Sequence, residues 1–220
     1  MKNNSEKKNF WLERSLSNML SSDWKVIKKY IHKDRYYDRD QAINNFLIVV
    51  KIFDKFDIDY RLIFGALLGL YRDNNLIEWD SDIDIFVTEE SFKKIIDQNI
   101  LDIIYNEGFI IRLENDKKKL KLFRNYEKIA INAYFLKNNK YSRPNYSFPE
   151  KLLHEHSFFK LKNFQIRVPK DVKKFLVYAY GENWKIPIKS SNEKDYIMSS
   201  VRSGGRFGRL LIRLKNLKFI

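Results

Sequence analysis

One segment of this chain, residues 64–87, constrains the fold more than any other and reads FGALLGLYRDNNLIEWDSDIDIFV. Its last part, residues 82–87, alternates acidic and apolar residues, as a half-buried β-strand does. Positions two apart on a strand point to the same face, so Asp80, Asp82 and Asp84 would share one face. Ile83, Ile85 and Val87 would anchor the opposite face in the core. The segment therefore predicts a rigidly held strand with an acidic face.

The same segment combines features that suit a metal and a phosphate. Three neighbouring carboxylates repel one another unless a divalent cation neutralises them, and their hard oxygen atoms favour Mg²⁺ or Mn²⁺. Gly65 and Gly69 flank the start of a predicted helix, where free backbone amides favour a phosphate, and Arg72 adds a guanidinium donor. A solvated acidic turn and tight helix packing are the alternative interpretations of the aspartates and the glycines taken separately. Their combination favours a metal and phosphate site.

The hydrophobic pattern predicts an α+β (α/β) domain built on a mixed β-sheet flanked by helices, with a C-terminal hairpin and helices. Thr88 is the expected N-cap of the helix that follows the acidic strand. The predicted helices cover residues 40–57, 65–71, 88–106 and a segment from Pro169 to Gly181. The predicted strands cover residues 60–64, 82–87, 109–113, 120–123 and 128–136, and the hairpin pairs residues 158–161 with 164–168.

Charge and length suggest a division of the chain into three parts. The 220 residues carry a net charge of +14, but residues 40–116 hold sixteen acidic against seven basic side chains. The N-terminal and C-terminal stretches and residues 117–128 are basic, which suggests a phosphate-bearing partner, although a bias towards lysine in composition is the simpler alternative. We expect a helical extension over residues 1–39, a catalytic domain over 40–200 and a basic amphipathic tail over 201–220.

The composition also bears on location. The absence of cysteine excludes disulfides, thiolate zinc sites and cysteine nucleophiles. The longest uncharged apolar stretch, residues 62–71, is too short to span a membrane, and the polar N-terminus shows no secretory signal, so a cytoplasmic location is expected. Residues 201–220 could lie on an anionic membrane surface, or could equally pack their leucines on the domain itself.

The segment over residues 64–87 resembles the signature of the LicD/fukutin-type phosphotransferase family, whose corresponding segment reads like GTLLGxxRxxxxIPWDxDIDI. This family belongs to the nucleotidyltransferase-fold superfamily. A second stretch supports the resemblance, because Val168-Pro169, a helix and then residues 180–187, YGENWKIP, are similar to the closing pattern of the family. Together the two stretches extend the resemblance over about half the chain.

The resemblance implies that Asp82 and Asp84 hold Mg²⁺ or Mn²⁺, with Asp80 as a third ligand or supporting acid. The donor phosphates would be positioned by the segment that contains Gly65, Ala66, Gly69 and Arg72. The implied reaction transfers a phospho-alcohol group, such as phosphocholine, phosphoribitol or phosphoglycerol, from a CDP-linked donor to a sugar hydroxyl of a cell-surface glycan and releases CMP. The glycan acceptor can be lipid-linked, and no nucleic acid partner is expected.

Three positions depart from the family pattern. Asn132 stands where a later strand usually supplies aspartate, Ala66 stands where threonine or serine is frequent, and Glu78 stands where proline is frequent. An amide can ligate a metal but cannot act as a base. Either Asp80 or a nearby acid such as Glu127 takes that role, or the protein is a slow or altered member of the family.

Two other functions remain open from the sequence. The first is a nucleotidyltransferase acting on a small molecule or macromolecule, since the same carboxylate strand serves that reaction. The second is a basic nucleic-acid-binding protein, although its acidic centre would repel a phosphate backbone. Trp79 and Trp184 could shape a nucleotide site or belong to the core.

Overall fold

The computed structural model of the chain describes residues 37–114, 118–190 and 192–202. Nearly all of the expected helical extension over residues 1–39 lies outside the described residues. The same holds for the basic tail expected over residues 201–220, apart from its first two residues.

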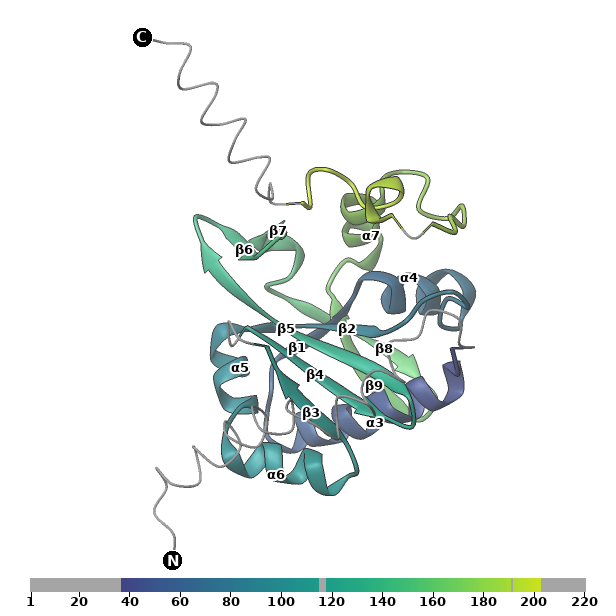
Figure 1. Ribbon diagram of the computed structural model, residues 1–220. Helices are drawn as coiled ribbons and strands as arrows, with labels where there is room; N and C mark the ends of the chain where they lie inside the picture. Colours follow the sequence, from purple (N-terminus) through teal and green to yellow (C-terminus); the bar gives the residue numbers. More distant parts are fainter. Residues whose placement is uncertain (1–36, 115–117, 191, 203–220) are drawn as a thin grey trace, which may run out of the picture.

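Within the described residues, a seven-stranded mixed sheet forms the centre of the molecule (Figure 1). Its main path has the order β1-β2-β5-β4-β3, and β6 and β7 extend the sheet from β5. β2 and β5 run parallel, whereas the remaining neighbours in the sheet are antiparallel. The strands are β1 (Tyr60–Ile63), β2 (Ile83–Thr88), β3 (Ile110–Leu113), β4 (Lys119–Arg124), β5 (Glu127–Lys137), β6 (Lys140–Arg143) and β7 (Tyr146–Pro149), with β8 (His156–Leu161) and β9 (Phe164–Pro169) in a separate hairpin.

Helices cover the sheet from both sides. In Figure 1, α3 and α6 lie below the strands, and α4 and α7 lie above them. The helices are α3 (Arg39–Lys55), α4 (Phe64–Asp73), α5 (Glu89–Ile95), α6 (Gln98–Asn106) and α7 (Val172–Tyr180), with short 3₁₀ turns at Glu150–Leu152 and Glu193–Asp195. The predicted α+β class, with a mixed sheet flanked by helices and a later hairpin and helices, is confirmed.

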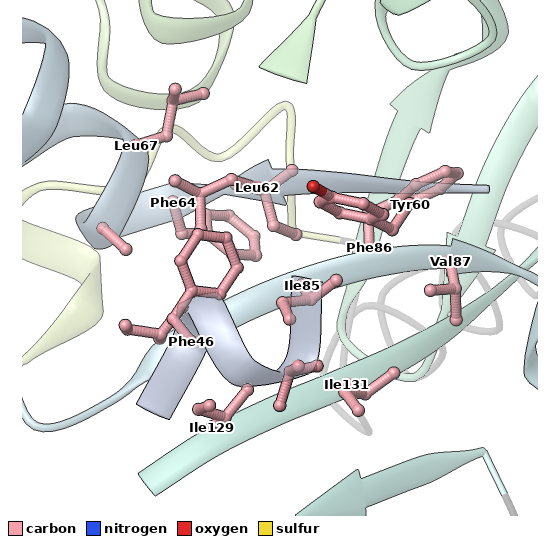
Figure 2. Packing of buried hydrophobic residues seen from close by; sticks show 14 of the residues in the cluster. Phe46, Tyr60, Leu62, Phe64, Leu67, Ile85, Phe86, Val87, Ile129 and Ile131 are labelled. Atoms are coloured by element: carbon pink, nitrogen blue, oxygen red, sulfur yellow. The ribbon is translucent and has the colours of Figure 1, made fainter. Parts of the chain in front are cut away.

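One part of the core lies between α3 and the inner strands, and another lies on the α4 and α7 side of the sheet, where Phe148 stacks on Phe175. Figure 2 shows Phe46 of α3 gathered with Ile85 of β2 and Ile129 of β5, and all three side chains are buried. Apolar side chains alternate along β2 and β5, so one face of these strands packs under α3. The opposite face carries Asp84 and Asn132 at one end and the buried aromatic pair Phe86 and Tyr134 next to them, with ring centroids 5.0 Å apart.

Two predicted boundaries are wrong for local reasons. The helix expected over residues 88–106 is interrupted at Ile96, because the Asp97 side chain accepts a hydrogen bond from Asn99 N at 3.0 Å and so caps a second helix, α6. The helix expected to start at Pro169 begins at Val172 instead. Pro169 is the last residue of β9, opposite His156, and the Asp171 side chain supplies the N-cap.

Strands β6 and β7 are absent from the sequence prediction. Their sequences, KYSR and YSFP, are short and lack a clear apolar alternation, so local periodicity does not reveal them. They form because the end of β5 offers an open edge to β6. This pairing carries Arg143 to the polar face of the sheet.

Arg61 on β1 holds the hairpin segment against the sheet. It is almost fully buried, forms an ion pair with Asp59, and donates through Nη2 to His154 O at 2.8 Å and through Nη1 to Tyr60 O at 2.8 Å. Buried carbonyls without a donor are costly, so this guanidinium satisfies groups that no apolar side chain could.

We therefore predict that Arg61→Met lowers the free energy of unfolding by about 3 kcal/mol, since several charge-assisted bonds are lost while the apolar volume is kept. Urea denaturation measures the change. Lys93→Ala is the control, because the Lys93 side chain is 70% exposed and its ion pair with Glu89 lies at the surface, and it should change stability by less than about 0.5 kcal/mol. Equal effects of the two substitutions would contradict this role of Arg61.

Candidate active site

A cleft of about 680 Å³ opens over the polar face of the sheet. Its walls come from α4, the connection before β2, strands β4, β5 and β6, and the segment that follows α7. The charged residues that line it are Arg72, Asp80, Asp82, Asp84, Lys119, Lys128 and Arg143. Segments far apart in the sequence therefore bring carboxylates and cations together in one place.

The three predicted aspartates all line this cleft, but not as one strand face. β2 begins at Ile83, so Asp84 lies on the strand, whereas Asp80 and Asp82 lie in the connection before it. Asp80 is held there by two backbone hydrogen bonds, one from its own amide to Ile77 O at 3.2 Å and one from the Ser81 amide to its Oδ1 at 2.9 Å. The expectation of a strand from residue 82 is thus wrong by one residue. The loop before β2, rather than one strand face, brings Asp80 and Asp82 to the same cleft as Asp84.

The local electrostatics disfavour the ionised aspartates. Withdrawal from water raises the pKa of Asp80 to about 7, and the neighbouring Asp82 carboxylate adds to this rise. Burial and the Asp82 charge likewise raise the pKa of Asp84 to about 6, while Lys119 and Arg143 oppose the rise. Burial, together with the Asp82 charge, therefore favours the protonated forms of Asp80 and Asp84.

Two neighbours act on the aspartates directly. Lys128 of β5 forms an ion pair with Asp82 at 3.0 Å, and Asn132 Nδ2 donates to Asp84 Oδ1 at 2.9 Å. Asn132 is fully buried and does not line the cleft. It therefore orients Asp84 from below, whereas the sequence resemblance expects a residue that faces the substrate.

The aspartates fit a hard divalent cation in their chemistry. They supply carboxylate oxygens in one cleft, and the burial and mutual repulsion that raise the pKa values of Asp80 and Asp84 would be offset by such a cation. In the described part of the chain, however, no group of three or more His, Asp or Glu side chains is arranged as a metal site. Because Lys128 engages Asp82, binding a cation there requires this ion pair to open or share its carboxylate.

Only part of the glycine-flanked helix start, residues 65–69, lines the cleft. Gly65 lines it, and a Cβ at this position would overlap Asp80 Oδ2, so glycine permits the approach of Asp80. Gly69 serves packing instead, because a Cβ there would lie 2.6 Å from Asn75 O and 2.8 Å from Ile77 N. Ala66 is buried and does not reach the cleft.

Arg72 lines the cleft, but its guanidinium is already engaged. Nε and Nη2 donate to the two carboxylate oxygens of Asp73 at 2.8 and 2.7 Å. A phosphate at Arg72 would have to compete with this fork. Glu127, which the sequence leaves open as a base, does not line the cleft and accepts a hydrogen bond from Asp38 N at 3.2 Å.

The sequence does not single out three cations that the fold brings to the cleft, Lys119, Lys128 and Arg143. Lys119 and Lys128 belong to the basic stretch over residues 117–128, so the charge pattern indicates basic residues there but does not place them in the cleft. Arg143 donates through Nε to Tyr134 Oη at 3.0 Å, and its guanidinium lies 4.2 Å from the centroid of the Tyr146 ring. Such stacking holds a guanidinium in a defined position.

Aromatic and apolar side chains form the wall opposite the sheet. Trp184 lines the cleft and packs against Tyr71 with ring centroids 5.9 Å apart, while Trp79 at the rim is 40% exposed. Tyr180 and Tyr196 complete this wall. A flat apolar surface beside charged groups suits a ligand that combines a ring with phosphates.

Comparison with known proteins yields a family match. Residues 57–171 match the family described as LicD/FKTN/FKRP, nucleotidyltransferase domain. The matched range runs from β1 to the N-cap of α7 and includes all of the charged residues that line the cleft. A search among curated proteins finds no match.

Similar solved structures are distant. Two structures of the antibiotic-resistance factor ANT(2″)-Ia, one in solution and one in a crystal with adenylyl-2″-tobramycin, are 12% and 14% identical, with TM-scores of 0.43. They cover 60% and 58% of this chain, which in turn spans 66% and 69% of theirs. A candidate nucleotidyltransferase from Thermotoga maritima is 18% identical, with a TM-score of 0.39 and coverage of 67% of this chain and 88% of its own.

We predict that Asp80→Asn stabilises the metal-free protein at pH 8 by on the order of 2 kcal/mol. The folded-state pKa lies above the ordinary value, so ionisation of Asp80 destabilises the fold as the pH rises from about 4 to about 7. The asparagine side chain in Asp80→Asn cannot ionise, so the variant does not lose this stability as the pH rises. Urea denaturation in EDTA should show the gain at pH 8 and little difference at pH 4.

The matched control is Asp57→Asn, because Asp57 has a side chain that is 94% exposed. It should leave stability unchanged at both pH values. A gain at pH 8 in this control, or none in Asp80→Asn, would contradict the conclusion that ionisation of buried Asp80 destabilises the fold.

The two glycines of the helix start should respond differently to alanine. Gly69→Ala forces a Cβ against backbone atoms, so we expect a loss of about 2 kcal/mol or more in stability. Gly65→Ala meets the end of the Asp80 side chain, which can move, so the loss should be smaller. Thermal unfolding of both variants compares them, and equal losses would contradict the separation of packing and site roles.

Proposed function

Because the chain belongs to the LicD/FKTN/FKRP nucleotidyltransferase-domain family, we propose that it is a metal-dependent phosphotransferase. The reaction moves a phospho-alcohol group of the phosphocholine, phosphoribitol or phosphoglycerol type from a CDP-linked donor to a sugar hydroxyl of a cell-surface glycan. Family membership supports the assignment of the chain as a transferase. The identities of the donor and the acceptor are part of the proposal. The observation that carries it is the meeting of three aspartates and four basic side chains in one aromatic-walled cleft.

In this proposal Asp82 and Asp84 hold Mg²⁺ or Mn²⁺, with Asp80 as a third ligand or supporting acid. A divalent cation supplies charge neutralisation and orientation for phosphate oxygens. Asn132 keeps the Asp84 carboxylate in one orientation through its 2.9 Å hydrogen bond. Transfer of this type depends on positioning and charge compensation and needs no covalent enzyme intermediate.

The cleft residues have distinct tasks in the proposed transfer. The acceptor hydroxyl oxygen forms a bond to the phosphorus of the transferred group, the bond from phosphorus to the CMP oxygen breaks, and CMP leaves with that electron pair. The hydroxyl proton passes to a carboxylate of the cleft. Asp80 is the candidate, because Asn132 is an amide and Glu127 lies outside the cleft.

The acceptor side of the proposal includes a glycan that can be lipid-linked. Among the helices that the structure describes, none is both long and apolar enough to cross a membrane. Contact with a membrane surface would therefore rest on the basic segment over residues 201–220, which lies almost wholly outside the described residues. A cytoplasmic or peripheral location is part of the proposal.

The decisive test is release of CMP from a panel of CDP-linked alcohols with glycan acceptors, in the presence of Mg²⁺ or Mn²⁺. We predict turnover with at least one donor, loss of turnover in EDTA, and a decrease of about a hundredfold or more in Asp82→Ala and Asp84→Ala. Mass spectrometry of the acceptor identifies the transferred group. Asp57→Asn, which removes an exposed carboxylate, should retain full activity.

Two results would overturn the proposal. Release of pyrophosphate from a nucleoside triphosphate without turnover of any CDP-alcohol would assign the protein to nucleotidyltransferases. Retained activity in both aspartate variants, with the fold verified by circular dichroism, would remove the aspartates from the reaction.

A further inference from the structure

Large apolar side chains lie exposed at the cleft. Ile186 and Ile188, in the segment after α7, line the cleft and are 61% and 47% exposed. Trp79 also lines it and is exposed. Tyr71 of α4 is exposed and packs against Trp184, another residue of the cleft wall. We name the four exposed side chains, Tyr71, Trp79, Ile186 and Ile188, the apolar rim.

The fold itself does not account for the apolar rim. A single exposed apolar side chain is ordinary, but several at one place indicate a contact surface. Among the described residues, Leu136 of β5 and Phe158 of β8 are also exposed, but they lie on separate elements. Residues 184–189, WKIPIK, form neither a helix nor a strand, so neither strand pairing nor helix packing explains two isoleucines there.

Lysines lie over the aromatic rings of this surface. Lys189 Nζ lies 5.8 Å from the centroid of the Trp79 ring, and Lys185 Nζ lies 5.6 Å from that of Trp184. A lysine that lays its apolar stem along such a surface keeps its ammonium group in water. Tryptophan, isoleucine and lysine in this arrangement are typical of residues at a membrane–water interface.

The C-terminal chain leaves the described structure close to the cleft. Tyr196 and Ile197 line the cleft, and Val201 O accepts a hydrogen bond from Ser147 N at 2.7 Å. The described part ends at residue 202, and residues 203–220 contain five basic side chains and no acidic one. The basic segment over residues 203–220 therefore continues from the part of the chain that carries the apolar rim.

The apolar rim and the basic segment differ in charge. Exposed Glu78 and Glu182 balance Lys185 and Lys189, so the rim itself offers mainly apolar contact. The basic segment offers positive charge. An anionic lipid bilayer suits both, because its interface takes up apolar side chains and its headgroups attract basic ones.

We propose that the apolar rim is a membrane-contact surface, which adds apolar contact to the attraction between the basic segment and an anionic bilayer. In Figure 1 the segment after α7 lies at the top of the molecule, beyond α4 and α7 as seen from the sheet. Contact on this side would bring the cleft to the bilayer surface. That the bilayer presents a lipid-linked acceptor rests on the proposed function, whereas the membrane contact does not.

Sedimentation of the full chain with vesicles of equal parts phosphatidylcholine and phosphatidylglycerol tests the surface without turnover. The wild type should bind, and the double variant Ile186→Ser, Ile188→Ser should bind about tenfold more weakly, because two apolar side chains are lost. Phe158→Ser is the matched control, since it removes an exposed apolar side chain from β8, outside the cleft, and it should stay within about twofold of the wild type.

Tryptophan fluorescence locates the contact. Brominated acyl chains quench an indole only when it enters the bilayer. Quenching should therefore fall in Trp79→Phe, whose indole is exposed in the wild type, and persist in Trp184→Phe, whose indole is buried. Circular dichroism of each variant verifies the fold.

Other occupants of the apolar rim give different results. Vesicle binding that is unchanged in the double isoleucine variant, with quenching independent of Trp79, would assign membrane contact to the basic segment alone and overturn the proposal. A dimer of the wild type in light scattering that dissociates in the double variant, without a change in vesicle binding, would assign the rim to a second copy of the chain and also overturn it.

The outcomes separate this surface from the proposed function. Vesicle binding that is weakened in the double variant, in a protein that turns over no CDP-alcohol, would support the membrane contact and refute the proposed function. Turnover of a CDP-alcohol with a water-soluble glycan, by a wild type that binds no vesicles, would do the reverse.

Discussion

The repulsion between like charges in one cleft is the constraint on which the rest of the site depends. Asp80, Asp82 and Asp84 converge there, and burial together with this repulsion raises the pKa values of Asp80 and Asp84. The fold sustains this arrangement because the other face of the same strands is packed with apolar side chains under α3. Burial of that apolar face stabilises the sheet and offsets the cost of holding like charges close together on the other face.

The register of the sheet then decides which partners meet the aspartates. Parallel pairing of β2 with β5 places Asn132 within hydrogen-bond distance of Asp84, and antiparallel pairing of β5 with β4 places Lys119 opposite Asn132. A shift of one residue in either pairing would turn these side chains to the other face. The cleft is therefore a property of the pairing as much as of the residues.

Most of the regular structure could be predicted from local pattern, and its errors have local causes. The strands over β1 to β5 and the hairpin of β8 and β9 follow clear alternation or apolar runs, so their predictions are confirmed. The division of the predicted helix at Asp97 and the late start of α7 at Asp171 arise from side-chain caps, which local periodicity does not resolve. β6 and β7 exist only through pairing at the edge of β5, so no local signal predicts them.

The sequence by itself determined the acidic motif, the fold class and the resemblance that the family match confirms, because spacing and hydrophobic period are local properties. Only the tertiary structure decided that Gly69 packs against backbone, that Asn132 lies beneath Asp84 and that Glu127 stays outside the cleft. It alone also brought Lys119 and Arg143 together. These features depend on contacts between segments distant in sequence, and which residues meet is set by strand pairing and packing rather than by local pattern.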